Sequence, residues 1–313
     1  MRKSYRIIIS VILLLVVGGG MLLYGFTVFS QVKQKDKVDV AISMRDTKTP
    51  GNAAILNDIL AEFEEHDKRV VWASAENSYK KQIEDIRELI DKEPEYLIIQ
   101  VLRSNGYEEV LKTLLPHTKV VYLEGIKEDG EVFYNIGFDP EEEGILSARL
   151  IAAALGTKGG NILEITGIQG AYVDKWHQSG LRKQLRSHDN IEIAAVLDEG
   201  GDRAAVFSKT YQYLLSNTEA IDIIYASTDE EGMGALLALQ RLGLEGDIPI
   251  VSVGGSADVK KAIMAGYFYG CVESVPFYGT ELYAVLYGGE IKQQTIFASK
   301  SITIDNVHKM RGY

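Results

Sequence analysis

The sequence predicts an α/β protein of two doubly wound parallel-sheet lobes, preceded by one transmembrane helix. Short apolar segments alternate with longer amphipathic segments through residues 38–313, as in a series of strand–helix units. The apolar segments are continuous runs, which are typical of strands buried on both faces of a parallel sheet. The chain has 313 residues, enough for two domains of ordinary size.

The N-terminal segment is basic at first and then uncharged. Arg2, Lys3 and Arg6 are the only charges before Gln31, and about 24 helical residues cross a hydrocarbon core of roughly 30 Å. Signal-peptide cores are shorter, at about 7–15 residues. Residues 1–30 are therefore expected to be an uncleaved anchor followed by a linker at 31–37, with cleavage after Ser30 as the alternative. Because a basic flank stays inside, we expect a single-pass cell-membrane protein with a cytoplasmic N-terminus and the remaining chain outside.

The rest of the chain is acidic. The formal net charge is −11 although the N-terminal segment is positive, and nucleic-acid binding requires a basic face. A nucleic-acid partner is therefore not expected. Cys271 is the only cysteine, which excludes an internal disulfide, and we expect it to be a small buried apolar side chain.

The first half is expected to contain four strands and three helices. The apolar runs are 38–44, 69–75, 96–102 and 119–125, and the helical segments are 51–67, 78–94 and 106–117. In the second helical segment, Ile83, Ile86, Leu89 and Ile90 recur at helical spacing and share one face.

The second half repeats the pattern. Helices are expected at 141–156, 176–188, 203–217, 228–243, 256–266 and 278–289, and strands at 160–167, 191–198, 221–227, 248–255, 266–275 and 298–306. The helix at 228–243 carries the clearest boundaries, since Thr228 or Asp229 can cap its start and Gly243 can end it. In such sheets, ligands bind outside the carboxyl ends of the strands.

Five segments follow one another along the chain: "SYKKQIEDIRELIDKEPEYLIIQVL", "GFDPEEEG", "YASTDEEGMGALLALQRLG", "VSVGGSADVKKAIMAG" and "CVESVPFYG". Their order and spacing resemble those of the type I periplasmic sugar-binding proteins, in particular the ribose and galactofuranose binders. The resemblance implies a three-crossover hinge near Asp139-Pro140, Glu273-Ser274 and Phe297–Ser299. It also implies a first lobe of 38–138 plus 275–297, and a second lobe of 142–272 plus 299–313.

The resemblance also marks ligand positions, at several of which this sequence departs from the family. Glu124-Gly125 stands where the family often has Asp-Arg, and His177 stands where an arginine is usual. Thr228 replaces an asparagine and Gly254 an aspartate, whereas Glu273 fits the galactofuranose-binder pattern.

The residues themselves suggest further contacts. Candidate ligand-binding residues at strand ends and helix starts are Arg45, Asp46, Arg103, Glu124, Trp176, His177, Asp202, Arg203, Thr228, Gly254 and Glu273. Tyr79, Phe277 and Tyr278 are candidate aromatic walls. The alternative is that these residues have structural roles without ligand contact. The arginines and acids would then be solvated loop charges, Trp176 would pack between the lobes, and Asp202 and Thr228 would cap helices.

The predicted function is an extracytoplasmic solute-binding protein that closes on a sugar or sugar-like ligand. Its partner would be an ABC permease or a membrane sensor kinase. Catalysis, a metal and a cofactor are not expected, since the five histidines are scattered and no catalytic motif is present. The alternatives are a degenerate fold that serves only as a protein-interaction module, and the effector domain of a transcription regulator, whose DNA-binding headpiece would have to replace the apolar segment.

Overall fold

The structure is a computed structural model that describes residues 37–103, 105–114, 116–125, 133–168, 170–198, 202–289 and 292–313. The expected membrane anchor at 1–30 lies outside these ranges. Among the residues that are described, no helix is both long enough and apolar enough to cross a membrane.

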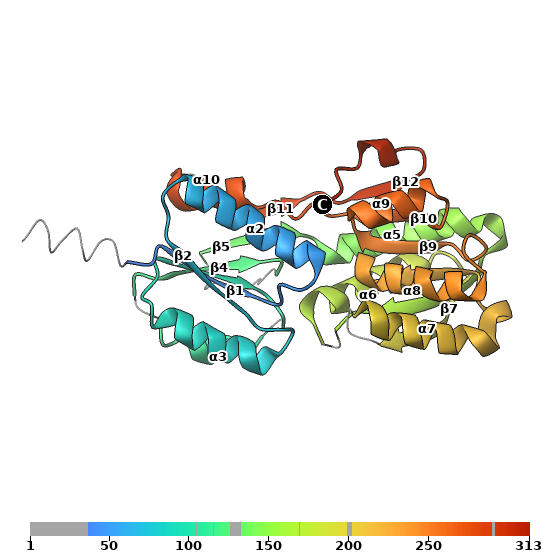
Figure 1. Cartoon of the computed structure of the whole chain (residues 1–313), viewed down its shortest axis with the longest axis horizontal. Helices are drawn as coiled ribbons and strands as arrows, with labels where there is room; N and C mark the ends of the chain where they lie inside the picture. The colour runs from blue at the N-terminus through green and yellow to red at the C-terminus, as the bar shows by residue number, and fades with distance from the viewer. Residues whose placement is uncertain are drawn as a thin grey trace, which may run out of the picture.

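Two six-stranded sheets lie end to end along the long axis of the molecule, and helices cover both faces of each (Figure 1). The first sheet contains β1 (Val40–Met44), β2 (Val70–Ser74), β3 (Tyr96–Gln100), β4 (Lys119–Leu123), β5 (Tyr134–Phe138) and β11 (Gln294–Phe297). Its strand order is β11-β5-β4-β3-β1-β2, and every neighbouring pair is parallel. We call this sheet and its helices lobe 1.

Alternate residues of each strand in the first sheet pack on its two opposite faces. Val40, Ile42 and Met44 of β1 pack under α2 (Pro50–Glu65) and α10 (Gly279–Tyr287). Ala41, between them, packs under α3 (Tyr79–Ile90) and the short α4 (Glu108–Leu111). Successive residues of a strand point to opposite faces, so both sets are buried and the run reads as continuously apolar.

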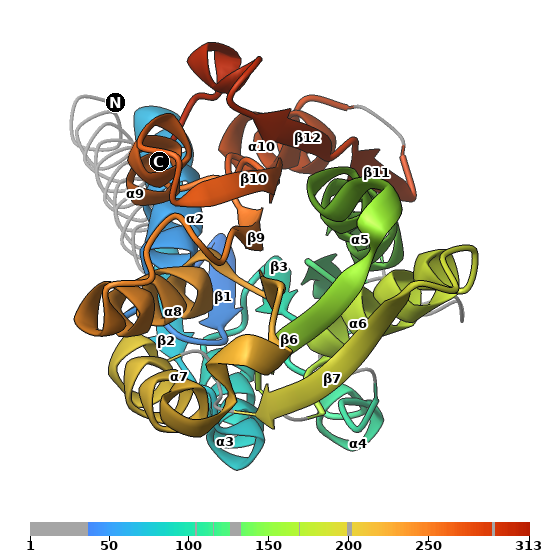
Figure 2. The same cartoon turned by 90° about the vertical axis from the view of Figure 1, so that its right-hand side faces the viewer.

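The second sheet forms lobe 2. Its strands are β6 (Gly160–Thr166), β7 (Ile191–Asp198), β8 (Ile223–Ala226), β9 (Ile250–Gly254), β10 (Phe268–Glu273) and β12 (Lys300–Thr303), in the order β12-β10-β9-β8-β6-β7. Its helices are α5 (Pro140–Leu155), α6 (Tyr172–Leu185), α7 (Arg203–Asn217), α8 (Asp229–Leu242) and α9 (Ala257–Met264). Figure 2 shows α5 and α6 on one face and α7, α8 and α9 on the other. Short 3₁₀ turns occupy Gly156–Lys158, Thr218–Ala220 and Val307–Lys309.

The chain passes between the two sheets three times. It leaves the first sheet after β5, returns after β10, and leaves again between β11 and β12. The two lobes are therefore joined by three adjacent segments rather than by one linker, an arrangement suited to hinge closure.

Helices α5 and α6 approach each other closely through two glycines. A Cβ atom on Gly180 of α6 would overlap the backbone carbonyl of Glu141 and lie 3.0 Å from the amide nitrogen of Ile145. A Cβ atom on Gly144 of α5 would overlap the carbonyl of His177 in the same way. The packing of these two helices requires glycine at both positions.

Most predicted elements are confirmed, including the α/β class and the two parallel-sheet lobes. Thr228 caps α8 by a capping box, Gly243 ends that helix in the left-handed conformation, and Cys271 is fully buried. The strands at the sheet edge differ from the expectation of two buried faces: β7 alternates between buried and exposed residues.

Four expectations are corrected by the structure. The helix expected at 106–117 is reduced to α4, because Thr113 bonds back to the carbonyl of Val110 and ends the helical pattern. Strands β5 and β11 were not predicted; each has only four or five residues. The last strand, β12, pairs antiparallel with β10. The helix expected at 176–188 already begins at Tyr172.

Candidate functional site

A cavity of about 220 Å³ lies between the lobes and is lined by residues from both. In lobe 1 its walls come from the segments that follow β1, β3 and β4, and in lobe 2 from the segments that follow β6, β8 and β9. These are the carboxyl ends of the strands, where doubly wound sheets bind their ligands. Pockets for drug-sized ligands occupy roughly 300–1,000 Å³, so this cavity suits a smaller molecule.

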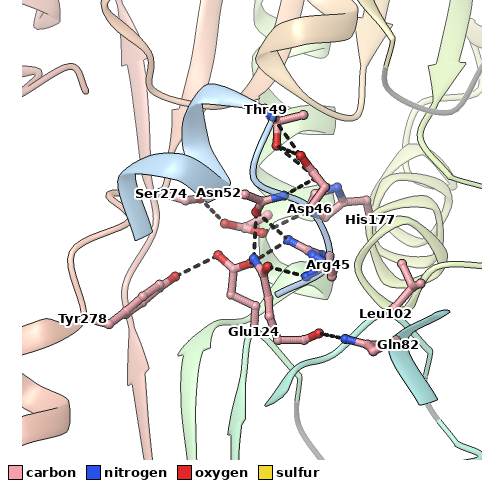
Figure 3. Close-up of polar contacts among 12 residues, drawn as sticks. Arg45, Asp46, Thr49, Asn52, Gln82, Leu102, Glu124, His177, Ser274 and Tyr278 are labelled. Carbon is pink, nitrogen blue, oxygen red and sulfur yellow. Dashed lines mark hydrogen bonds and ion pairs between the residues drawn. The ribbon is translucent and has the colours of Figure 1, made fainter. Parts of the chain in front are cut away.

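Glu124 is the centre of the lobe 1 wall. Its carboxylate accepts hydrogen bonds from Arg45 Nη2 at 2.6 Å, Gln100 Nε2 at 2.9 Å and the Tyr278 hydroxyl at 3.0 Å (Figure 3). Burial raises the pKa of Tyr278 well above its usual value, so this phenol remains a neutral donor. Arg45 and Glu124 therefore form a fixed, paired wall.

Asp46 organises the turn that leads into α2. It accepts hydrogen bonds from the backbone amides of Lys48 and Thr49, each at 2.8 Å, and from Asn52 Nδ2 at 2.6 Å. Burial by itself would raise the pKa of Asp46, but these donors together hold it below its usual value. The carboxylate thus stays ionised at neutral pH and fixes the position of Asn52 at the cavity.

In lobe 2, Asp229 fills the turn after β9. It accepts hydrogen bonds from the amides of Gly255 at 2.8 Å and Ser256 at 2.6 Å, and from Ser252 Oγ at 2.7 Å. Burial raises its pKa in spite of these donors. A Cβ atom on Gly254 would lie 2.7 Å from the Asp229 carboxyl group, so glycine is required there. The amides that could cradle a phosphate are already occupied by this side chain.

Two more acids lie side by side on the lobe 2 wall. Asp174 accepts from the Gly167 amide, Ser227 Oγ and Gln178 Nε2, each at 2.8 Å. Glu231 belongs to the capping box of α8, and its Oε2 accepts from the Thr228 amide at 2.9 Å. Its Oε1 is buried without a hydrogen-bond partner among the described residues. Burial, and next the charge of Asp174, raise the pKa of Glu231 to about 8.

Glu143 ties the hinge together. This buried residue of α5 is 2.9 Å from His177 Nε2 of α6 and accepts hydrogen bonds from Ser274 and Ser299. Ser274 follows β10, and Ser299 lies between β11 and β12. One carboxylate, in the helix turn that follows the first crossing, therefore contacts the other two segments that join the lobes (Ser274 and His177 are labelled in Figure 3). We call this group the hinge knot.

Replacing Glu143 with Gln is expected to lower the free energy of unfolding by about 1–2 kcal/mol, because a neutral amide weakens the contacts with the two serines and the imidazole. Urea unfolding at neutral pH measures the change. Glu142→Gln is the matched control, since Glu142 is an exposed residue of the same helix turn. Equal stability of the two variants would contradict a structural role for the hinge knot.

The structure brings six of the predicted site residues to the cavity wall. They are Arg45, Asp46, Glu124, His177, Thr228 and Gly254. His177 does not lie at the helix start. It lies in the second turn of α6, is 2% exposed, and faces Glu143.

The other five predicted residues do not line this cavity. Arg103 is exposed and stacks on the ring of Tyr79 at 4.7 Å. Trp176 also lies in α6, and it packs against the apolar cluster of lobe 1. Glu273 is buried and accepts from the amide of Arg311 at 3.1 Å.

Asp202 and Arg203 have structural contacts at the start of α7. Asp202 caps the helix by accepting from the amides of Ala204 and Ala205, each at 2.9 Å. Arg203 pairs with Glu230 through Nε at 2.9 Å and Nη2 at 2.6 Å. Arg203 therefore lies behind a cavity residue instead of at the wall.

Sequence reasoning missed several residues of the wall: Asn52, Phe138, Glu143, Asp174, Glu231 and Tyr313. The capping-box spacing of Thr228 and Glu231 could have identified Glu231, since the third residue of a helix that starts at a strand end faces the cleft. Of the aromatic candidates, Tyr278 is fully buried behind Glu124; Phe138 and Tyr313 are the aromatic residues of the wall.

Within the described part of the chain, no group of three or more His, Cys, Asp or Glu side chains is arranged to hold a metal ion. The polar groups of the wall are instead distributed over both lobes. The arrangement can surround a small polar molecule and hydrogen-bond it from opposite sides.

Known proteins of similar sequence are also binding proteins for small molecules. A family model described as a periplasmic binding protein domain matches residues 40–287. The xylitol-binding protein of Mycolicibacterium smegmatis is 25% identical over 246 residues, which are 76% of this chain and 69% of that protein. The ribose import binding protein of Bacillus subtilis is 23% identical over 264 residues, covering 84% of this chain and 85% of that protein.

A solved structure shows the same fold. The crystal structure of a galactofuranose binding protein superposes with a TM-score of 0.81 at 22% identity, covering 87% of this chain and 96% of the other.

Proposed function

Because the chain belongs to the family of periplasmic binding protein domains, we propose that it is an extracytoplasmic receptor whose two lobes close on one sugar or sugar-like molecule. The observation that carries the proposal is the small cavity between the lobes, whose polar wall comes from the strand ends of both. A ligand that contacts both walls binds the closed arrangement better than an open one, and this difference in affinity sets the population of the closed state.

The names of the relatives support a sugar or polyol as the ligand. One binds xylitol and another serves ribose import. The relatives are binding proteins, which agrees with a receptor and not an enzyme. Asn52, Asp174 and the Arg45–Glu124 pair supply the planar donors and acceptors that hydroxyl groups require.

A screen of the purified full chain against pentoses, hexoses, polyols and amino sugars tests the proposal. A ligand that binds only the folded state adds about 2.7 kcal/mol of stability at a hundredfold excess over Kd, and is expected to raise the melting temperature. Titration calorimetry should then show that Arg45→Ala and Asp174→Asn each weaken binding by about tenfold or more, through loss of one wall contact from each lobe.

The chain offers a matched control for each variant. Arg103→Ala removes an arginine at a neighbouring strand end that lies outside the cavity wall, and Asp202→Asn exchanges one helix cap for another. Both should keep the affinity within about twofold. A folded protein that binds no member of the panel would contradict the proposed receptor and favour a protein-interaction module.

The partner is proposed to be an ABC permease that receives the solute or a membrane sensor kinase that reads the lobe geometry. Ligand uptake by membrane vesicles that depends on this chain would identify the first, and ligand-dependent autophosphorylation would identify the second. Membrane anchoring by residues 1–30 is part of the same proposal. Mass spectrometry of the membrane fraction tests it, because a mature chain starting at Gln31 would refute the uncleaved anchor.

A further inference from the structure

The cavity wall is strongly acidic. Seven carboxyl side chains line it, against one guanidinium group, Arg45, and one imidazole, His177; the acids are Asp46, Glu124, Glu143, Asp174, Asp229, Glu230 and Glu231. Arg45 pairs with Glu124, Arg203 pairs with Glu230 from behind the wall, and His177 contacts Glu143. The other four acids accept only from neutral donors among the described residues, so the wall carries an excess of negative charge.

Three polar atoms of lining residues are buried without a hydrogen-bond partner in the described part of the chain: Asn77 Oδ1, His177 Nδ1 and Glu231 Oε1. Of the three, only Glu231 Oε1 belongs to a carboxyl group. Glu231 Oε1 is fully buried and has no hydrogen-bond partner in the described part of the chain. A Cβ atom built on Gly167 would lie 3.3 Å from Glu231 Oε1 and 3.4 Å from Asp174 Oδ1, so both oxygens flank the same point of the wall. Gly167, Asp174 and Glu231 all line the cavity. Burial without a donor and the neighbouring carboxylate make the ionised form of Glu231 costly, so in the empty cavity this carboxyl group holds a proton at pH 7.

We propose that the natural ligand carries a protonated amino group beside its hydroxyl groups, and that this ammonium group binds at Glu231 and Asp174. The inference rests on the proposed receptor function and names the chemical class of its ligand. An ammonium group has three donors and no acceptor. It replaces the proton of Glu231, donates to the ionised carboxylate and balances its charge beside Asp174. A hydroxyl group supplies a donor but no positive charge.

Other charged groups near Glu231 do not perform this role. Asp229 and Glu230 precede it in α8 and are themselves acidic, and Tyr225 of β8 is a buried phenol. Arg203 of α7 directs both of its bonded nitrogens to Glu230. The same excess of negative charge disfavours anionic ligands such as sugar phosphates.

Matched ligands test the inference. Xylitol, 1-amino-1-deoxyxylitol and its N-acetyl derivative share one skeleton, and only the second carries a charge; myo-inositol and an aminodeoxyinositol form a cyclic pair. In calorimetry of the full chain at pH 7, at least one amine is expected to bind about 30-fold more tightly than its neutral partner, since hydrogen bonds to charged groups are the stronger ones. N-acetylation should remove this advantage.

Variants locate the effect. Glu231→Gln should reduce the preference for the amine over its neutral partner to below about threefold, because the amide retains an acceptor but not the charge. Glu142→Gln, the same change at an exposed position, should leave both affinities unchanged. Binding of the amine should also release close to one proton at pH 7, since Glu231 titrates at about 8 in the empty cavity. Measurement in buffers of different ionisation enthalpy detects that proton.

The outcomes separate this inference from the proposed function. If the neutral polyols bind as tightly as the amines, or more tightly, the inference is wrong and the receptor function stands. The inference is equally wrong, and the receptor function again stands, if the amine is preferred but Glu231→Gln keeps the preference. If a folded protein binds none of these ligands and no member of the wider panel, both are wrong.

Discussion

The free energy of unfolding of the Glu231→Gln variant is expected to exceed that of the unsubstituted protein by about 3–5 kcal/mol at pH 8.5. Below pH 4.5 the two values should be equal. The pKa of Glu231 is about 8 in the folded protein, against a usual value of 4.5. Between these two values the folded chain holds a proton that the unfolded chain has released. Rising pH therefore destabilises the unsubstituted protein across this range, and the full loss is present once the pH exceeds 8.

The amide removes this titration and keeps the helix cap. Its oxygen can still accept from the Thr228 amide, as Glu231 Oε2 does at 2.9 Å. Guanidinium unfolding of the ligand-free protein at several pH values between 4.5 and 8.5 measures the difference. Asp174→Asn should move the pH dependence to lower pH, since the charge of Asp174 is the second cause of the raised pKa. If the free energies of unfolding of Glu231→Gln and the unsubstituted protein changed with pH in the same way, the burial of an ionisable group at this position would be contradicted.

Gly180→Ala is expected to destabilise the protein by about 3 kcal/mol or more, at the upper end of the range for overpacked sites. The added methyl group meets backbone atoms of Glu141 and Ile145 in α5, not the end of a flexible side chain. The backbone of α5 can make room for the methyl group only if the two helices move apart. Gly144→Ala, at the facing position of α5, should act in the same direction.

Gly51→Ala is the control for the added methyl group. Gly51 lies in the first turn of α2, and a Cβ atom there meets only the side chain of Tyr313, at 3.2 Å. Its effect should stay below about 1 kcal/mol, near the difference in helix propensity between the two residues. Thermal or urea unfolding of the three variants makes the comparison. A Gly180→Ala protein as stable as Gly51→Ala would refute the backbone contact between α5 and α6.

Much of the fold was predictable because the signal is local. Continuous apolar runs mark strands covered on both faces, and the capping box of Thr228 together with Gly243 fixes both ends of α8. The start of α6 was not predictable in this way. Its N-cap residue is Ala171, which makes no side-chain hydrogen bond. No sequence signal therefore separates the helix from the preceding turn, and the predicted start at Trp176 falls four residues after the observed one.

The candidate site was less predictable because it depends on contacts between distant segments. Strand-end position alone indicated Arg45, Asp46 and Glu124 correctly as wall residues, but it also indicated Arg103, which lies outside the cavity. Glu143 meets Ser274 and Ser299, which lie 131 and 156 residues away in the sequence. Only the folded arrangement of the three crossing segments shows this contact.

The hinge knot limits how the two lobes can move relative to each other. Three crossing segments could in principle bend independently, so that the lobes would twist and slide as well as open. Glu143 lies in the helix turn that follows the first crossing, and its carboxylate holds the other two segments. We therefore expect the three segments to bend together and one angle between the lobes to describe the motion. Any protein that contacts both lobes would then sense that single angle, without touching the cavity itself.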